Sequence, residues 1–416
     1  MVKKVKQIYI KNKGFLWMLA VAFVVKSLMT QIIYGHESDM LWFTVWPDAI
    51  YECGFSQFYS QPYLTDYPPG YMYILYFTAW IRYHILGGVA ANSSIGVYLL
   101  KVVPIIFELF TGALIYKIAL KEFSAKYGVL LSMAYLFNPA VWVNSSLWGQ
   151  VDSVYTFFVV FMCYLCQCKK RKAAYFAFAA GILLKPQTMM FAPVILYSII
   201  EQVFMEDFTL KKFFQDLFSG LAAIGCMILV VMPYGLNNVI EQYKSTMESY
   251  PFASVNAYNF WALIGQNYQL QTGHLFGIQY QTWGTVAIFA AVILSAIVFF
   301  KSKGKDKYYS SMALLISLVF TFSVRMHERY LFPVMVLIMF AYIVSSKKYL
   351  LWAYTGFSLC LLINEAHVLY LNIRYYANPS TEPVIYITAI LLIVILLYYM
   401  TMLLKNNLSF VTKNTK

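Results

Sequence analysis

Apolar runs of membrane-spanning length recur along the whole 416-residue chain, and they constrain its fold more than any other feature. A helix needs about 20 apolar residues to cross the roughly 30 Å of hydrocarbon in a bilayer. Lipid cannot hydrogen-bond to the backbone, so each span is expected to be a helix, in which the backbone groups pair with one another. With 61% hydrophobic and 12% charged residues, the composition lies far from that of a soluble protein. The sequence therefore predicts an all-α polytopic membrane protein.

The apolar runs place the spans and leave two long segments between them. Spans are predicted near residues 15–34, 98–120, 128–143, 152–168, 173–186, 188–201, 214–234, 281–300, 309–325, 330–346, 349–370 and 382–404. We expect one domain over residues 1–416, a bundle of about 12–13 transmembrane helices. The two long segments are a first outer loop, 35–97, with short helices, and a second outer loop, 235–280.

The net charge of +13 comes from short clusters of lysine and arginine between the apolar runs. This pattern is typical of cytoplasmic loops and argues against nucleic acid as a partner. Residues 69–85 are apolar enough to cross, but a crossing would move Lys117 and Lys121 outside. We therefore expect an embedded or re-entrant helix there, with a true span as the alternative. The polar motifs then share the non-cytoplasmic side.

The first outer loop gathers acids in an otherwise apolar chain. Asp39 follows the first span by a few residues, where a carboxylate is anchored yet open to water and can act as a general base. The alternative is an ordinary solvated acid. Asp66 precedes Pro68-Pro69, a pair that favours a helix beginning there, so Asp66 can cap that helix or bind substrate.

Further polar groups interrupt later apolar runs. Trp148 offers a stacking face, and Gln150 and Asp152 can bind sugar hydroxyls. Lys185, beside Pro186, is a candidate phosphate ligand. Lys101, inside the second span, can meet a lipid phosphate or extend to the membrane surface.

The segment Arg325-Met-His-Glu-Arg-Tyr330 concentrates two guanidinium groups, an imidazole and a carboxylate between two spans. Planar guanidinium groups suit a phosphodiester, and the alternative is structural charge pairing. The five histidines are scattered without metal-site spacing, and no phosphate-binding loop or dinucleotide motif is present. No cofactor is expected, and a divalent metal ion is the less favoured alternative.

Taken in order, the acid after the first span, DYPPGY (66–71), NSSLWGQVDS (144–153), LLKPQ (183–187) and RMHERYLFP (325–333) resemble motifs of the GT-C superfamily of membrane glycosyltransferases. Within it, the chain looks most similar to bacterial membrane proteins related to the second GPI mannosyltransferase. The matching motifs extend from about residue 35 to 333. The motif Glu37-Ser38-Asp39 matches the paired acids of the metal-using branch only in part, which is why no metal is expected.

The resemblance implies an enzyme that moves mannose or another hexose from a polyprenyl-phosphate carrier to a glycan, lipid or protein acceptor, with inversion. It implies a bacterial plasma membrane location and an outward-facing site. Asp39 matches the catalytic acid. Phosphate binding is expected of Lys185, Arg325, Arg329 and Lys101. Sugar or acceptor binding is expected of Asp66, Trp148, Gln150, Asp152, Gln187, His327 and Glu328.

Two other classes of function fit a polar face on a helix bundle. A transporter or flippase for a polyprenyl-linked sugar also needs outward polar groups and charges inside the membrane. A non-catalytic scaffold needs neither the acids nor the cations. Functional polar groups on both membrane faces would favour the transporter.

Overall fold

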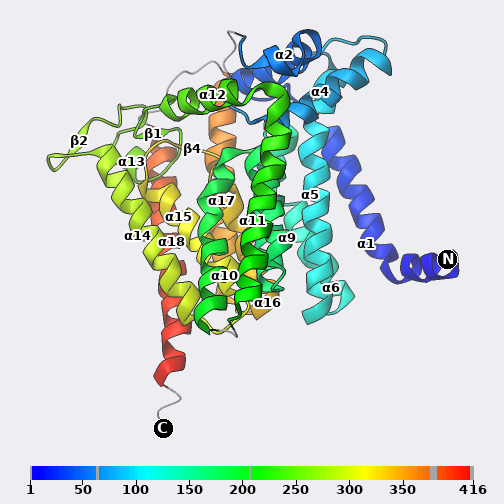
Figure 1. The fold of residues 1–416 in the computed structure, drawn as a ribbon. Helices are drawn as coiled ribbons and strands as arrows, with labels where there is room; N and C mark the ends of the chain where they lie inside the picture. Colours follow the sequence, from blue (N-terminus) through cyan, green and yellow to red (C-terminus); the bar gives the residue numbers. More distant parts are fainter. Residues whose placement is uncertain (1, 62–64, 206–207, 375–381, 413–416) are drawn as a thin grey trace.

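The computed structural model describes residues 2–61, 65–205, 208–374 and 382–412, so residues 62–64 of the first outer loop lie outside the description. The chain folds into a bundle of long helices crowned by short helices and strands (Figure 1). In chain order the elements are α1 (Val2–Met29), α2 (Glu37–Cys53), α3 (Phe55–Phe58), α4 (Pro69–His84), α5 (Ser94–Glu122), α6 (Ala125–Leu136), α7 (Pro139–Val141), η1 (Trp142–Trp148), α8 (Asp152–Gln167), α9 (Arg171–Leu184), η2 (Pro186–Phe191), α10 (Ala192–Met205), α11 (Leu210–Val231), η3 (Met232–Tyr234), α12 (Leu236–Glu248), β1 (Ser254–Val255), α13 (Phe260–Leu263), β2 (His274–Leu275), β3 (Ile278–Gln279), α14 (Tyr280–Lys301), α15 (Lys307–Phe322), β4 (Met326–His327), α16 (Phe332–Ser345), α17 (Tyr349–Ile373) and α18 (Pro383–Thr412).

The prediction of an all-α polytopic protein is confirmed. Most predicted spans fall on a single long helix, but span 128–143 covers α6, α7 and the start of η1, and span 188–201 covers the end of η2 and most of α10. Among the described residues the strands form two short pairs, β1 with β4 and β2 with β3. Seven helical stretches among the described residues are long and apolar enough to cross a membrane. Three shorter apolar helices, α8, α15 and α16, lie among them. The count of seven is below the predicted 12–13 because several helices of the bundle have fewer than 18 residues.

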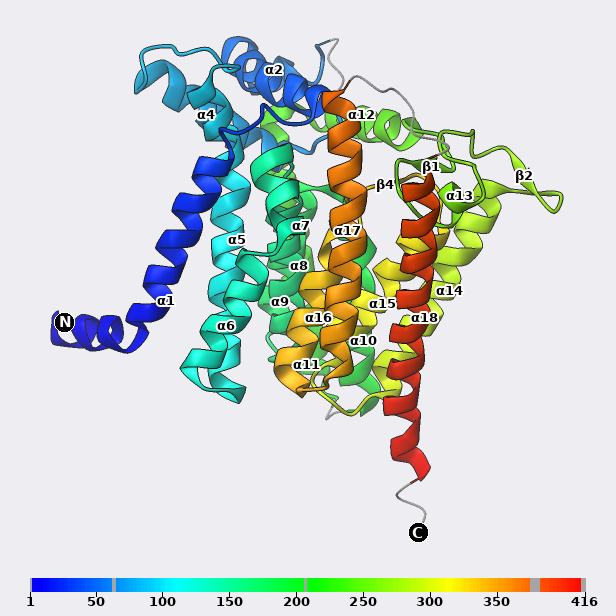
Figure 2. The same ribbon diagram turned by 180° about the vertical axis from the view of Figure 1, so that it is seen from behind.

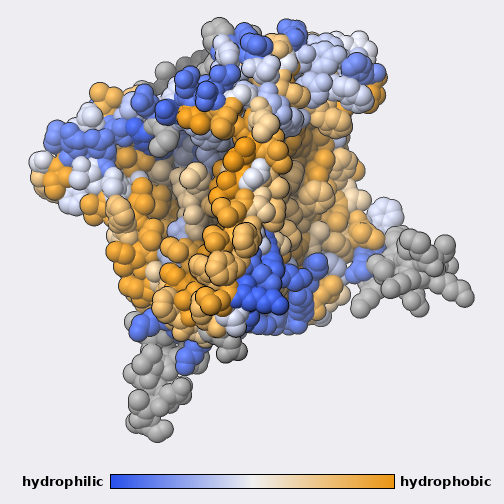
Figure 3. Space-filling view, viewed as in Figure 1, coloured by the Kyte–Doolittle hydropathy of each residue, from blue (hydrophilic) through white to orange (hydrophobic). Residues whose placement is uncertain are grey.

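The two ends of the bundle differ in character. We call the end that carries α2, α4, α12 and the strands the loop-rich end (Figures 1 and 2). We call the opposite end, where Lys169–Lys172, Lys301–Lys307 and Lys347–Lys348 lie between long helices, the basic end. An apolar band separates them, with polar residues gathered over the loop-rich end (Figure 3). Bilayer-spanning proteins have this layering.

The centre of the bundle is built from helices without a polar face. Phe332 to Ile343 of α16 are all buried, between α15, α17 and α8. A helix that is apolar all round is stable only when surrounded. By contrast, Ala223 is the one buried residue among the described side chains of α11, and large apolar side chains such as Phe218 and Leu229 are exposed there. The peripheral helices thus face the membrane while α16 forms the core.

Helix α4 lies in the layer at the loop-rich end and does not run the length of the bundle, as expected for an embedded helix (Figures 1 and 2). It packs against α2, α9 and α5. Pro69 occupies its first turn, where a missing N–H costs nothing. Of the two alternatives for Asp66, capping of α4 does not hold, because Pro68 is the N-cap and makes no side-chain capping hydrogen bond. Asp66 is therefore not explained by helix capping.

Candidate active site

Four segments distant in sequence bring their polar side chains together at the loop-rich end. They are the first turn of α2, the junction of η1 and α8, the end of α9, and the stretch after β4. Asp39, Asp152, Lys185 and Arg329 lie at these four places and are joined by ion pairs. We call these four residues the charged cluster.

Asp39 is the most exposed carboxylate of the cluster, with 22% of its side chain accessible. One oxygen, Oδ2, accepts hydrogen bonds from Trp148 Nε1 and Gln150 Nε2, each at 2.6 Å. The same oxygen lies 3.8 Å from an Nη of Arg329 and 3.7 Å from Nδ1 of His36. Asp39 is thus oriented by fixed donors through one oxygen.

The backbone around Trp148 is shaped to bring it to Asp39. Pro139 begins a short helix that widens into the π-helical turn η1, a form often found at functional sites. Gly149 ends that turn at φ 93°, and a Cβ there would meet Met40 Sδ at 2.5 Å. Only glycine fits both the left-handed conformation and the close approach.

Lys101 holds this turn in place and does not join the charged cluster. Its ammonium is fully buried and donates to the backbone oxygens of Ile33 at 3.0 Å, Ser146 at 3.2 Å and Leu147 at 2.9 Å. All its donors are therefore used by carbonyls near the end of η1. In this arrangement Lys101 has no N–H left for a phosphate, so its observed role is to hold the backbone at η1.

Lys185 leaves α9 because proline follows it. The residue before a proline avoids the helical region, and Lys185 is extended, with φ −156° and ψ 125°. Its ammonium donates to Asp152 Oδ1 at 2.5 Å and lies 5.8 Å and 5.4 Å from the ring centres of Tyr67 and Tyr155. Lys185 is 3% exposed. It is a fixed cation beside the carboxylate that begins α8.

Arg329 connects the carboxylates of the cluster. One Nη lies 2.5 Å from Glu328 Oε1, and Nε lies 3.8 Å from Asp152 Oδ2. Nε is buried without a hydrogen-bond partner, so this ion pair leaves a donor available. The guanidinium carbon lies 5.9 Å from the ring centre of Trp148.

The second predicted guanidinium has a different role. Arg325 Nε donates to Gln271 Oε1 at 2.8 Å, and the Arg325 backbone N–H donates to Phe252 O at 3.0 Å. Both partners belong to the second outer loop. Strand β1 of that loop pairs in parallel with β4, Val255 opposite His327. Arg325 therefore fastens this loop beside the cluster, and we do not assign it a place at the phosphate.

The pKa values of the surrounding acids diverge. Burial raises the pKa of Asp39, but the charges of Arg329 and His36 and the two hydrogen bonds outweigh it and bring the value to about 2. Burial, followed by the charge of Asp39, raises the pKa of Asp66. Burial also raises that of Glu328 despite Arg329. Asp39 is therefore ionised, whereas Asp66 and Glu328 bind protons more readily because their pKa values are raised.

The remaining predicted residues lie around the cluster. His327 contacts the rings of Tyr250 and Tyr330 edge to face or tilted, at 5.0 Å and 5.1 Å. Burial and then Arg329 lower the His327 pKa to about 3, so it is a neutral imidazole. Gln187 Nε2 donates to Tyr330 Oη at 2.8 Å, and Gln187 Oε1 is buried and unpartnered.

Sequence reasoning missed a buried extension of the site. Asn144 Nδ2 bridges two carboxyl groups, donating to Asp152 Oδ2 at 3.0 Å and to Glu365 Oε1 at 2.7 Å. Asn144 and Glu365 are fully buried. A carboxyl group inside the apolar run of 349–370 is a recognisable signal, since an acid in a membrane span is costly without a function or partner. Tyr67, whose hydroxyl donates to Gln150 Oε1 at 3.2 Å, was also missed.

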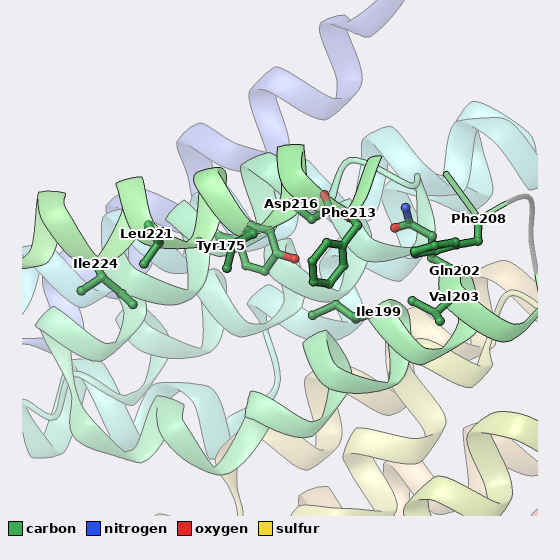
Figure 4. A pocket seen from close by; sticks show the side chains of 11 residues that line it. Tyr175, Ile199, Gln202, Val203, Phe208, Phe213, Asp216, Leu221 and Ile224 are labelled. Atoms are coloured by element: carbon green, nitrogen blue, oxygen red, sulfur yellow. The ribbon is translucent and has the colours of Figure 1, made fainter. Parts of the chain in front are cut away.

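A cavity of about 270 Å³ lies elsewhere, between α9, α10 and α11 (Figure 4). Its walls are apolar apart from Gln202, Asp216 and the Tyr175 hydroxyl, and Asp216 pairs with Arg171 at 3.2 Å. It suits an apolar chain and lacks reactive groups. Within the described ranges, no group of three His, Cys, Asp or Glu residues is arranged to hold a metal ion. The charged cluster is therefore the best candidate for chemistry.

No protein-family model matches this chain, and no curated protein matches it significantly in sequence. The case for a function accordingly rests on the geometry of the charged cluster and its surroundings.

Proposed function

We propose that this protein is a polyprenyl-phosphate-sugar-dependent hexosyltransferase of the bacterial plasma membrane, with its site at the outer face. One observation carries the proposal: Asp39, a partly exposed and ionised carboxylate, lies in one cluster with two cations, the buried Lys185 and Arg329, whose side chain is 12% exposed. An acceptor, whether a glycan, a lipid or a protein, supplies a hydroxyl group. The site is assigned to the outer face because the basic clusters at the opposite end of the bundle are typical of cytoplasmic loops.

In the proposed reaction, a carboxylate oxygen of Asp39 takes the proton of the acceptor hydroxyl. The hydroxyl oxygen forms a bond with the anomeric carbon while the bond from that carbon to the phosphate oxygen breaks. The phosphate leaves with the electron pair, and the configuration inverts. Trp148 and Gln150 hold Asp39 through Oδ2, which leaves Oδ1 for the acceptor.

The cations stabilise the leaving phosphate as its charge grows. At rest they are balanced by carboxylates, so an incoming phosphate competes with Asp39 and Glu328 for Arg329. The raised pKa values of Asp66 and Glu328 favour this exchange, because protonation of either acid removes negative charge when the phosphate arrives. Asp152 remains paired with Lys185.

The apolar cavity supports a lipid-linked donor. Tyr175 in its wall and Lys185 at the cluster are both on or next to α9, ten residues apart, or about 15 Å along a helix. A prenyl chain whose phosphate lies at Lys185 can extend along α9 toward this cavity. The carrier's tail and phosphate then have separate, chemically matched sites.

The direct test uses detergent-purified protein and a radiolabelled polyprenyl-phosphate hexose, with and without an extract of envelope acceptors. Transferase activity is expected as acceptor-dependent release of polyprenyl phosphate together with a labelled, larger product. A flippase would instead move the intact donor across liposome membranes without releasing phosphate. That second result, with no product formed, would reject the enzyme.

A further inference from the structure

A small β-hairpin projects from the second outer loop beyond α14 (Figures 1 and 2). Its strands are β2 and β3, and Phe276-Gly277 forms the turn. Both turn residues have positive φ, 53° for Phe276 and 78° for Gly277, as in a type I′ turn. Asparagine or glycine normally occupies the first of these positions, and Phe276 is 89% exposed. The fold thus holds the bulky Phe276 side chain outward in a positive-φ conformation that is unfavourable for such a residue.

The hairpin has one apolar and one polar face. Residues directly opposite each other in an antiparallel pair point to the same side. Leu275 lies opposite Ile278, and His274 lies opposite Gln279. Ile278 is 41% exposed. Leu275 is half-buried and packs against the core cluster around Trp261 and Tyr280, so Ile278 and Phe276 at the tip make the exposed apolar edge, while His274 and Gln279 form the polar side.

The hairpin is fixed at the level where a membrane span begins. Gln279 is the N-cap of α14, one of the seven spans. Trp283, in the first turn of α14, donates from Nε1 to Leu275 O at 3.1 Å. Further along α14, Val286 and Phe289 are exposed to the surroundings of the bundle. The hairpin therefore lies directly before a helix whose exposed side chains are apolar.

The surrounding sequence lacks charge. Between Glu248 and Lys301 there is no Asp, Glu, Lys or Arg, although residues 249–279 are loop and short elements outside the spans. A loop exposed fully to water usually carries charges, whereas uncharged aromatic residues concentrate at the membrane interface. This composition favours lipid over water around the hairpin.

We propose that the hairpin 274–279 is an interfacial anchor, with Phe276 and Ile278 inserted at the boundary of headgroups and acyl chains in the leaflet at the loop-rich end. The occupant of this surface is phospholipid. A second copy of the chain is less suited, because strands of two residues offer little edge for pairing. The inference is independent of the proposed glycosyl transfer.

Insertion would set the height of the second outer loop above the membrane. The same loop supplies Gln271 to Arg325 and pairs through β1 with β4, directly before Glu328 and Arg329. The anchor is thus linked to the charged cluster through a short run of backbone. A device of this kind would hold the charged cluster at a fixed height relative to the membrane surface.

The test measures depth in the membrane with an environment-sensitive nitrobenzoxadiazole label. Full-length, cysteine-free protein carrying Phe276→Cys, Ile278→Cys or His274→Cys is labelled and placed in phospholipid nanodiscs, one molecule per disc. Labels at 276 and 278 should show blue-shifted emission and quenching by shallow doxyl lipids, but little quenching by iodide. The label at 274 should be quenched more by iodide. Equal iodide quenching at all three positions would overturn the proposal.

A second variant separates insertion from folding. Phe276→Asn creates an Asn-Gly turn, which suits the type I′ conformation, so thermal stability in detergent should be kept or increased. In nanodiscs the same change should move the label at position 278 toward water. An unchanged emission of the label at position 278 would overturn the proposal. It would also be overturned if the labels were protected from iodide only in nanodiscs that hold two copies of the protein.

Discussion

Both ends of the bundle hold a network of charges, but the two networks differ in balance. At the basic end, Glu201 accepts from Lys169 at 2.7 Å, Lys307 at 2.5 Å and Tyr308 at 2.5 Å, with both carboxylate oxygens engaged. At the loop-rich end, carboxyl groups outnumber the cations that they surround. The acids there are Asp39, Asp66, Asp152 and Glu328, around Lys185 and Arg329.

This comparison separates a structural tie from a candidate site. Glu201 joins α10 to the segment before α9 and to the first turn of α15, and both its carboxylate oxygens are engaged without a ligand. In the charged cluster Arg329 Nε is buried without a hydrogen-bond partner, and so is Oε1 of Gln187 beside the cluster. Buried polar groups usually find partners, so such gaps point to a place where something else binds. Because Arg171 Nη1 and Asp306 Oδ1 at the basic end are also buried without hydrogen-bond partners, the gap at Arg329 points to a site only together with the partly exposed carboxylate of Asp39 beside it.

The largest expected effect is on Asp39. Asp39→Asn keeps the shape of the side chain and removes its basicity, so turnover should fall about a hundredfold or more. The measurement is product formation from labelled donor by folded, purified protein. Glu52→Gln, an exposed acid on the same helix, is the matched control and should be neutral. If Asp39→Asn kept activity within tenfold of the parent, Asp39 would not be the general base.

A smaller loss of turnover is expected from Arg329→Lys, about tenfold or more, because a lysine keeps the charge but loses the fixed planar donors. Donor binding should weaken less than turnover, since the phosphate gains charge as the bond breaks. Arg325→Lys is the comparison variant and should retain more activity. If Arg329→Lys melted normally and turned over as fast as the parent, Arg329 would have no role in stabilising the leaving phosphate.

Glu201→Gln should act on stability and not on chemistry. The Lys169 side chain is 42% exposed, so solvent weakens this network, and a loss of about 1 kcal/mol in unfolding free energy is expected. Thermal unfolding in detergent measures it, with turnover per folded molecule determined in parallel. Loss of turnover without any change in melting would give the basic end a functional role and erase the contrast between the two ends.

The pH dependence of stability tests the burial of His327. Its pKa of about 3 lies below the unfolded value near 6.5, so the unfolded chain binds more protons between these values. The contribution of neutral His327 is fully present above about pH 6.5 and decreases as the pH falls toward 3. Melting of the parent should therefore decline faster on acidification from pH 7 to 5 than melting of His327→Gln. If the melting temperatures of the parent and of His327→Gln declined in parallel, the imidazole of His327 would be in contact with solvent in the folded protein.

The smallest perturbation tests sidedness alone. Single cysteines at the exposed positions Ser56 and Lys303, in a cysteine-free background, should leave activity unchanged. An impermeant maleimide added to intact cells should label position 56 at the loop-rich end, and should label position 303 only after the cells are opened. The reverse pattern would place the charged cluster in the cytoplasm.

The sequence by itself determined which segments are helices in the bundle and which motifs carry polar groups. Apolar run length and proline position are local properties, so the spans and the exit of Lys185 from α9 follow from neighbouring residues. The motifs around Asp39, Trp148 and Arg329 were recognised for the same reason. Their meeting in one cluster was an expectation that the ion pairs now support.

Only the tertiary structure decided which partner each charge has. Lys101 and Glu108 share a helix, yet Glu108 pairs at 2.8 Å with Lys26 of α1, and Lys101 binds backbone oxygens. Asn144 reaches Glu365, 221 residues away. Such choices depend on how helices pack and which buried donor lacks an acceptor, because a charge removed from water must be matched by whatever group the fold brings within reach.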